Sequence, residues 1–173
     1  MIFLEVMEIF DHVFGETDLE IIFDKVKQPK WRYGHGSHTD NSGIPFWIME
    51  LDDDPFFYDY CLNIIRDVVK QPGLCLEHVY ANGHVFGDKG MPHVDSHHDD
   101  GATFLFYANP KWNRLWGGQT SFDFGQGRHA SSMPARNRAV YFPGKVTHYA
   151  EEVSRTFTGL RVTIAWKLNG AKF

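Results

Sequence analysis

The sequence predicts an α+β fold that is mainly β, with its helices in the first 73 residues and a sandwich or jelly roll of strands after them. Two observations support this prediction. Apolar residues keep a helical spacing up to Val69, whereas after Leu74 they alternate with a period of two. Aromatic residues make up 16% of the chain, as expected of a β-rich core or an aromatic-lined cleft.

The chain of 173 residues has the length of one compact domain and contains no internal repeat or Gly/Ser linker. Its hydrophobic fraction of 43% and charged fraction of 23% exclude a disordered chain or a coiled coil. A single domain over 1–173 is therefore predicted. Residues 1–73 would form a helical N-terminal support, and residues 74–168 would form the jelly-roll core.

The first predicted helix follows a short strand or hairpin start in residues 1–14. Thr17 and Glu20 match a capping box, in which two side chains three residues apart satisfy free N–H groups at the start of a helix. We expect this helix to run to about Lys27, because Pro29 cannot continue it.

The second predicted helix begins at Asp54 and Pro55, an N-cap residue followed by a residue suited to the first turn. Its apolar residues keep helical spacing until the chain reaches Pro72. Between the two helices, residues 31–45 predict a loop that contains aromatic residues and histidines, and residues 46–51 predict a strand.

Short alternating segments separated by Gly, Pro, Asn or Asp predict the strands of the second part of the chain. These segments are 74–81, 84–86, 102–108, 119–124, 137–142, 146–151 and 157–168.

Charge and cysteine content limit the partners and the compartment. The net charge of −5 and a pI of about 6.0 argue against a nucleic-acid partner, for which a basic face is expected. The N-terminal segment is too short and acid-interrupted for a signal peptide or a membrane span. Cys61 and Cys75 form no metal-type pair, so we interpret both as buried free thiols in a reducing compartment. We therefore expect a soluble cytoplasmic protein; its oligomeric state has no signature in the sequence.

Two of the 10 histidines are placed to share one metal ion with an aspartate. His93 and Asp95 are two residues apart, so in an extended chain both side chains project from one face. His148 follows a turn and a predicted strand. Two imidazoles and one carboxylate on adjacent strands match the triad of non-haem Fe(II) oxygenases, which leaves coordination positions open for a cosubstrate and O₂. His97 and Asp99 form a competing pair, or part of a solvated, weakly metal-binding loop.

Six short motifs follow one another between Leu74 and Leu168. In chain order they are Tyr80, the tripeptide HVD at 93–95, TFLFYANPKW at 103–112, GGQTSF at 117–122, PARNRAVYFPGKVTH at 134–148 and RVTIAWKL at 161–168. In these motifs and their order the chain resembles the 2-oxoglutarate- and Fe(II)-dependent dioxygenases, most closely their prolyl 4-hydroxylase-like branch. Each motif alone is a weak signal, but six in the family's order are specific.

The resemblance implies a fold and a reaction. The family's fold is a double-stranded β-helix, a jelly roll with N-terminal helices packed on it. Its enzymes use Fe(II), 2-oxoglutarate and O₂, with ascorbate as an optional reductant, and release succinate and CO₂ as they hydroxylate a C–H bond. The resemblance therefore implies an oxygenase that acts on a peptide, prolyl or otherwise, or on a small molecule.

The resemblance also assigns the metal ligands. It carries this role over to His93, Asp95 and His148, as the catalytic and metal-binding residues. The distance to the following strand supports this assignment, because His97 and Asp99 would leave little room for a turn before Thr103.

The far carboxylate of 2-oxoglutarate needs a buried cation, and Arg161 is the first candidate because a guanidinium pairs bidentately with a carboxylate. Arg155 is a rival, since the segment between His148 and Arg161 is a few residues longer than the family pattern. By resemblance the Tyr107 hydroxyl donates to the same carboxylate. The remaining predicted cosubstrate contacts are Thr103 and Tyr80.

Three other functions stay open at this point. One is a jelly-roll metalloenzyme with the same triad and no 2-oxoglutarate, and another is a catalytically inactive jelly-roll protein that binds a metal or ligand. A halogenase is disfavoured by Asp95, because family members that bind halide have a small residue there. Aromatic residues and histidines near the expected entrance are interpreted as core or solvated side chains; they are Trp31, His35, His38, Trp112 and Trp116.

Overall fold

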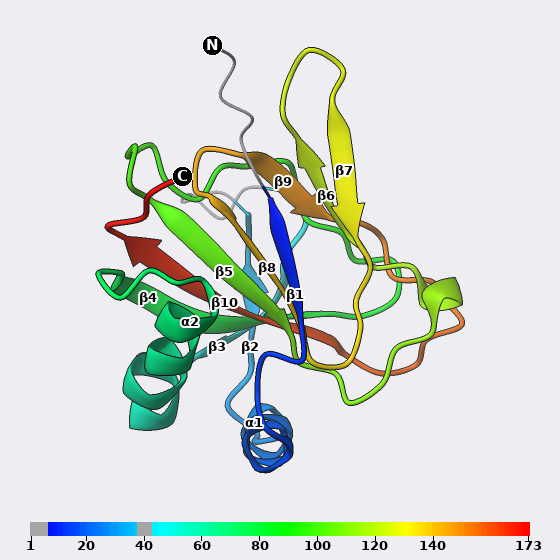
Figure 1. Cartoon of the computed structure of the whole chain (residues 1–173). Helices are drawn as coiled ribbons and strands as arrows, with labels where there is room; N and C mark the ends of the chain where they lie inside the picture. The colour runs from blue at the N-terminus through cyan, green and yellow to red at the C-terminus, as the bar shows by residue number, and fades with distance from the viewer. Residues whose placement is uncertain (1–6, 38–42) are drawn as a thin grey trace.

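Two antiparallel sheets make up most of the computed structural model, which describes residues 7–37 and 43–173 (Figure 1). The larger sheet has the strand order β1-β8-β5-β10-β4-β3-β2. Its strands are β1 (Glu8–Asp11), β2 (Arg32–His35), β3 (Phe46–Glu50), β4 (Cys75–His84), β5 (Ala102–Tyr107), β8 (Arg138–Pro143) and β10 (Arg161–Asn169). The smaller sheet has the order β7-β6-β9, formed by β6 (Thr120–Asp123), β7 (His129–Ser132) and β9 (Thr147–Ala150).

The helical segments are short and few among the described residues, so the prediction of a mainly β fold is confirmed. They are α1 (Glu16–Val26), the π-helix η1 (Phe56–Cys61), α2 (Leu62–Val68) and the 3-10 turn η2 (Arg114–Trp116). The first 73 residues are less purely helical than expected, because they also supply β1, β2 and β3 to the larger sheet. None of the helices in the described ranges is long and apolar enough to span a membrane.

Helix α1 begins two residues earlier than a capping box at Thr17 would place it. The N-cap residue is Gly15, which has no side-chain cap, and Thr17 lies inside the first turn. The acidic side chains of Glu16 and Asp18 in that turn complement the positive end of the helix dipole instead. The helix ends at Val26, close to the predicted end.

The second helical segment starts where Asp54 was expected to cap it, since the Asp54 carboxylate accepts a hydrogen bond of 3.0 Å from the Phe56 amide. The segment opens as the π-helix η1 and continues as α2 up to Val68. Its buried face packs on the larger sheet, where the Trp166 indole N–H of β10 donates to the Phe57 carbonyl at 3.0 Å.

Most strands lie within a few residues of their predicted positions, with three exceptions. The predicted segments 74–81 and 84–86 are largely one strand, β4, and residues 85 and 86 lie beyond it. Strand β2 falls in the predicted loop 31–45, and β7 pairs with β6 where no strand was predicted. The interpretation of Cys75 as a buried thiol is wrong, because its residue is exposed, whereas Cys61 is buried. His38 lies outside the described residues.

The two faces of the larger sheet bury different parts of the core. On β5, Phe104 and Phe106 pack in the cluster that includes the helices, whereas Leu105 and Tyr107 pack in the cluster that includes Phe122 of the smaller sheet. This alternation follows from the period of two along a strand. On β4 and β10, every second residue therefore faces the helices, and the residues between them point into the space between the two sheets.

Candidate metal centre and cosubstrate pocket

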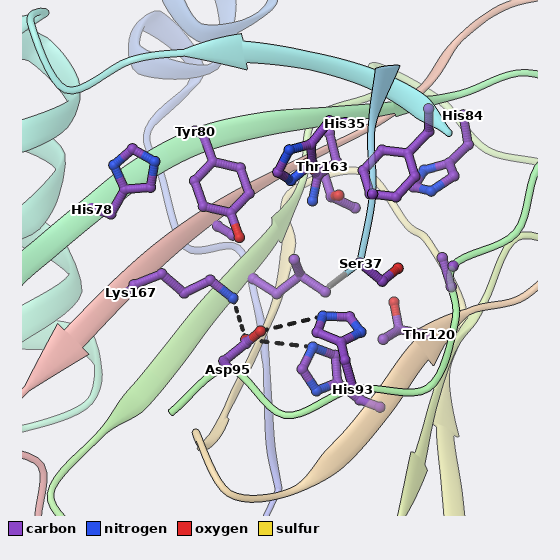
Figure 2. A pocket seen from close by; sticks show the side chains of 18 of the residues that line it. His35, Ser37, His78, Tyr80, His84, His93, Asp95, Thr120, Thr163 and Lys167 are labelled. Carbon is purple, nitrogen blue, oxygen red and sulfur yellow. Dashed lines mark ion pairs between the residues drawn. The ribbon is translucent and has the colours of Figure 1, made fainter. Parts of the chain in front are cut away.

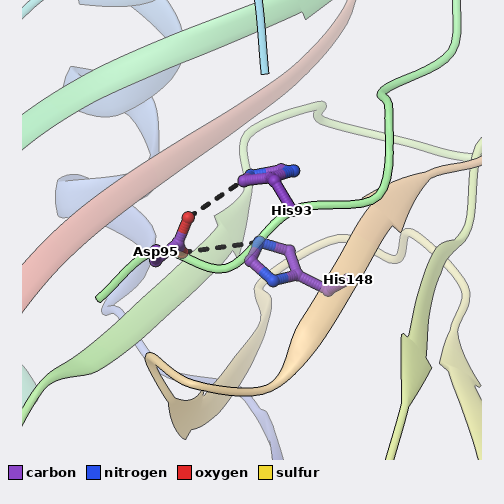
Figure 3. A group of neighbouring side chains, drawn as sticks. All are labelled: His93, Asp95 and His148. Carbon is purple, nitrogen blue, oxygen red and sulfur yellow. Dashed lines mark ion pairs between the residues drawn. The ribbon is translucent and has the colours of Figure 1, made fainter. Parts of the chain in front are cut away.

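His93 and His148 are brought together by the backbone. They form an isolated antiparallel bridge, with His93 N–H donating to the His148 carbonyl at 3.1 Å and the reverse hydrogen bond at 2.9 Å. As a result their rings lie close together, 4.4 Å apart between centroids and tilted by 49° (Figure 3). Two residues on, the Asp95 amide donates to the Gly144 carbonyl at 2.9 Å, which fixes the aspartate beside both rings.

The Asp95 carboxylate faces both imidazoles through their Nε2 atoms. His93 Nε2 lies 3.3 Å from Oδ1, and His148 Nε2 lies 3.4 Å from Oδ2. The ligand atoms of the three side chains all lie within 4.8 Å of one another. The structure thus places the three residues assigned as metal ligands in one cluster.

The other ring nitrogens fix the tautomer of both histidines. His93 Nδ1 lies 2.8 Å from the Met91 carbonyl, and His148 Nδ1 lies 3.0 Å from the Val146 carbonyl. Since a carbonyl only accepts, each Nδ1 carries a proton and each Nε2 is the nitrogen turned toward the cluster. Metal-binding histidines in proteins are oriented by the same kind of second hydrogen bond.

The charges of the cluster also suit a divalent cation. Burial lowers the pKa of His148 to about 4, so its imidazole is neutral at physiological pH. Burial alone would raise the pKa of Asp95, but the cation of Lys167 and the two imidazoles hold it well below its usual value. A carboxylate with two imidazoles fits Fe(II) in the facial arrangement of two histidines and one carboxylate.

The competing pair from the sequence lies elsewhere. His97 and Asp99 are both exposed, and the Asp99 carboxylate forms an ion pair with Lys145. A second cluster of possible ligands, Glu50, Asp52 and His78, has both carboxylates on exposed residues. Each imidazole nitrogen of His78 already lies against one of those carboxylates, so we assign no metal to this cluster.

A pocket of about 340 Å³ extends from the metal-ligand cluster between the two sheets (Figure 2). That volume lies in the range of small-molecule sites. Its wall is formed by alternate residues of two neighbouring strands that stand in register as cross-strand pairs. These pairs are His84 and Arg161, Asn82 and Thr163, Tyr80 and Ala165, and His78 and Lys167.

Arg161 lies in this wall and is almost fully buried, with 1% exposure. Its Nε donates to the Gly118 carbonyl at 2.6 Å and its Nη2 donates to Thr120 Oγ1 at 3.2 Å. Burial lowers the pKa of Arg161 only to about 10, so the guanidinium stays charged. The rival Arg155 is exposed, with its guanidinium 5.7 Å from the ring centroid of Phe86, and it does not line the pocket.

Two polar side chains of the pocket wall are buried without a partner. Both ring nitrogens of His84 and the Asn82 side-chain oxygen have no hydrogen-bond partner in the described part of the chain. Buried polar atoms left in this way cost free energy unless a ligand or water satisfies them. His84 also stands directly opposite Arg161, so the unpaired groups gather around the guanidinium. The pocket therefore fits a small anionic ligand.

The other three predicted cosubstrate contacts, Tyr80, Tyr107 and Thr103, lie in different surroundings. Tyr80 lines the pocket. The Tyr107 hydroxyl is buried behind Arg161, donates to the Ser132 carbonyl at 2.8 Å and lies 3.0 Å from Thr120 Oγ1. The Thr103 hydroxyl donates to Asp95 Oδ2 at 2.6 Å, which places it on a metal ligand instead of on the expected cosubstrate.

Sequence reasoning missed several residues of the pocket wall, namely His84, Asn82 and Lys167, and interpreted His35 as solvated although it lines the pocket. One available signal was the alternation along the last strand, where Arg161, Thr163 and Ala165 share a face that Lys167 continues. The positions on β4 had no such signal, because their pairing with Arg161 depends on the strand register.

A cluster of two histidines and one carboxylate in a pocket with a buried arginine, held between two antiparallel sheets, is the arrangement typical of mononuclear non-haem metalloenzymes. The model of the 2OG-Fe(II) oxygenase superfamily matches residues 78–166, about half of the chain. The chain therefore belongs to the 2OG-Fe(II) oxygenase superfamily and is an oxygenase. Membership in this family implies Fe(II), 2-oxoglutarate and O₂.

Solved structures of prolyl hydroxylases share the fold. A prolyl hydroxylase from Trichoplax adhaerens, in complex with a peptide fragment of the hypoxia inducible factor oxygen degradation domain, has a TM-score of 0.72 at 14% identity, over 95% of this chain and 84% of that one. The Pseudomonas putida prolyl-4-hydroxylase has a TM-score of 0.70 at 15% identity, over 96% and 93% of the two chains.

A viral collagen prolyl hydroxylase from Paramecium Bursaria Chlorella virus-1, solved with 2OG, has a TM-score of 0.65 at 13% identity, over 94% and 96% of the two chains. No curated protein sequence matches this chain. The solved structures of prolyl hydroxylases confirm the resemblance to the prolyl 4-hydroxylase-like branch at the level of the fold.

Proposed function

We propose that this protein is a 2-oxoglutarate-dependent hydroxylase that oxidises a C–H bond of a peptide or small-molecule substrate and releases succinate and CO₂. The single observation that supports it best is the placement of two sites in one pocket. The metal-ligand cluster of His93, Asp95 and His148 lies at one end of the wall and buried Arg161 lies along it.

In this proposal His93, Asp95 and His148 hold Fe(II) through two Nε2 atoms and one carboxylate. When bound, iron and 2-oxoglutarate supply the oxidative decarboxylation that makes O₂ reactive toward an unactivated C–H bond. The chain supplies orientation and the exclusion of water. Apolar wall residues such as Leu105 and Ala165 line the pocket between the metal ligands and Arg161.

Arg161 would anchor the far carboxylate of 2-oxoglutarate. Its Nε and Nη2 are held by Gly118 and Thr120, so the guanidinium is already oriented before the ligand arrives. We propose that His84 adds a hydrogen bond at this end, because both of its ring nitrogens have no partner in the described chain and one of them carries a proton to donate. For Tyr107 to join them, its hydroxyl must exchange the Ser132 carbonyl for the carboxylate.

Several finer features belong to the same proposal. The two sheets correspond to a double-stranded β-helix within one oxygenase domain, supported by α1 and α2 on the far face of the larger sheet. A peptide substrate, with prolyl peptides as the first candidates, is supported by the peptide bound to the Trichoplax adhaerens structure of the same fold. Ascorbate would serve as a reductant, and the expected location is the cytoplasm.

The direct test is to add Fe(II) and 2-oxoglutarate without oxygen to the pure protein and to His148→Ala. We expect a visible metal-to-ligand charge-transfer band in the wild type alone. A folded wild type without the band would overturn the proposal in favour of an inactive or 2-oxoglutarate-independent protein. Succinate release in air, with and without candidate prolyl peptides and small molecules, then identifies the substrate class.

A further inference from the structure

A lysine contacts the aspartate of the metal-ligand cluster. Lys167 Nζ forms an ion pair with Asp95 Oδ2, and Figure 2 shows its side chain reaching along the pocket wall to that carboxylate. Both side chains are largely removed from solvent, with 4% exposure for Asp95 and 15% for Lys167. At this burial an ion pair is screened much less than one on the surface.

The sheet register holds this contact in place. Lys167 of β10 stands directly opposite Thr103 of β5, so their side chains project from the same face of the larger sheet. The Thr103 hydroxyl donates to the same Asp95 oxygen at 2.6 Å. Lys167 also lies over the ring of Tyr80, with Nζ 5.6 Å from the ring centroid. The ammonium thus lies between the Asp95 carboxylate and the ring of Tyr80 on β4.

The two Asp95 oxygens have different neighbours. Oδ2 receives the ammonium of Lys167 and the hydroxyl of Thr103 in addition to facing His148 Nε2, whereas Oδ1 faces only the Nε2 atom of His93 among these groups. A carboxylate held on one oxygen in this way offers its other oxygen to a metal. The Asp95 carboxylate carries one negative charge, and the ammonium of Lys167 cancels it.

We propose that Lys167 is a positioning residue and a fixed counter-charge for the metal centre. Before the metal binds, Lys167 keeps Asp95 paired; after the metal binds, the same positive charge remains beside the cation. Metal binding is then weaker than the ligand set alone would make it. With a divalent cation bound, the cation, the Asp95 carboxylate and the Lys167 ammonium together carry a net charge of +2. Such a centre attracts a dianionic cosubstrate more strongly than a centre without the lysine, whose net charge would be +1.

The test compares two substitutions of Lys167, one that removes the positive charge and one that keeps it. Lys167→Gln keeps a hydrogen-bond donor near Asp95 but removes the charge, and Lys167→Arg keeps the charge. Mn(II) serves as the probe, and free Mn(II) is measured by electron paramagnetic resonance during titration. We expect Lys167→Gln to bind Mn(II) about tenfold more tightly than the wild type, because a nearby positive charge is gone. Lys167→Arg should bind Mn(II) as the wild type does.

A second readout uses the same proteins. The melting temperature of metal-free Lys167→Gln should fall, since a buried carboxylate loses its counter-charge, while its shift on adding Mn(II) should increase. Thr103→Val is the matched control, because it removes a neutral donor from the same oxygen; it should not tighten Mn(II) binding. A merely structural role for Lys167 would lower the melting temperature of the metal-free protein and leave Mn(II) binding unchanged or weaker.

The part of the test that measures 2-oxoglutarate binding rests on the proposed function. In the Mn(II)-loaded protein, Lys167→Gln should bind 2-oxoglutarate about tenfold more weakly than the wild type, opposite in sign to its effect on the metal. Unchanged or weaker Mn(II) binding by Lys167→Gln overturns the counter-charge while the proposed function stands. A wild type that binds Mn(II) but not 2-oxoglutarate overturns the proposed function, and the Mn(II) titration still decides the role of Lys167.

Discussion

Arg161 of β10 and His84 of β4 are directly opposed partners in the larger sheet, and both are buried in the wall of the same pocket. Burial, together with the charge of Arg161, lowers the pKa of His84 to about 3. The imidazole therefore stays neutral next to the guanidinium and keeps one N–H to donate. A cation and a neutral donor side by side suit a carboxylate, which accepts several hydrogen bonds at once.

The first prediction concerns the pH dependence of stability. In the unfolded chain a histidine takes up a proton near pH 6.5, but folded His84 does not until about pH 3. The unfolded state therefore binds more protons below pH 6.5, and the metal-free protein should lose stability as the pH falls from there.

Each such histidine contributes a slope of up to about 1.4 kcal/mol per pH unit. His148, with its pKa lowered to about 4, adds to the loss over the same range. His84→Phe should reduce the pH dependence of the free energy of unfolding between pH 6 and 4 by the contribution of about one proton. Urea unfolding of the metal-free protein at several pH values measures this. An unchanged slope would show that His84 is protonated in the folded state.

A second prediction tests the fit of Arg161 against Gly118. Gly118 has a φ of +69°, and a Cβ added there would lie 3.0 Å from Arg161 Cδ and 3.2 Å from its Nε. Gly118→Ala should displace the guanidinium and weaken 2-oxoglutarate binding by about tenfold or more, with unchanged Mn(II) affinity. Isothermal titration of the Mn(II)-loaded protein with 2-oxoglutarate measures this.

Gly125→Ala is the matched control for that experiment. Gly125 has a similar φ of +74°, but its added Cβ would meet nothing within 4 Å. Both variants therefore share the cost of an alanine in the left-handed region, about 1 kcal/mol or more. Equal 2-oxoglutarate affinities of the two variants would contradict the proposed role of Gly118.

A third prediction separates the two candidate arginines. Arg161→Gln should raise the dissociation constant of 2-oxoglutarate about a hundredfold, because a charged, bidentate partner is lost. Saturating 2-oxoglutarate should restore the charge-transfer band. Arg155→Gln should bind as the wild type does, since Arg155 is exposed and contacts Phe86 outside the pocket. The reverse result would assign the carboxylate to Arg155.

A fourth prediction follows from linkage between binding and folding. Mn(II) and 2-oxoglutarate together should stabilise the wild type by about 2–3 kcal/mol at a hundredfold excess over the dissociation constant. Asp95→Asn, which removes the anionic ligand, should lose most of this stabilisation. Thermal unfolding with and without both ligands measures the effect, and no shift in the wild type would contradict the assigned site.

Local sequence patterns determined the order of the main elements and the spacing of the metal ligands. The period of two along a strand and the HVD tripeptide are properties of neighbouring residues, so they can be read without knowing what the strand pairs with. The same holds for the position of the second helical segment, which begins after Asp54. The resemblance to the oxygenase family supported His148 as the third ligand and added the role of Arg161, because the motif order is also a property of the chain.

Only the tertiary structure decided which side chains surround those residues. Lys167 meets Asp95 and His84 meets Arg161 because β10 pairs with β5 and β4 in one particular register. A slip of one residue would turn either side chain to the opposite face of the sheet, and no local pattern specifies that register. The same physical reason separates Arg161 from Arg155, since a position inside or beyond the last strand decides whether a guanidinium is buried in the pocket or exposed to water.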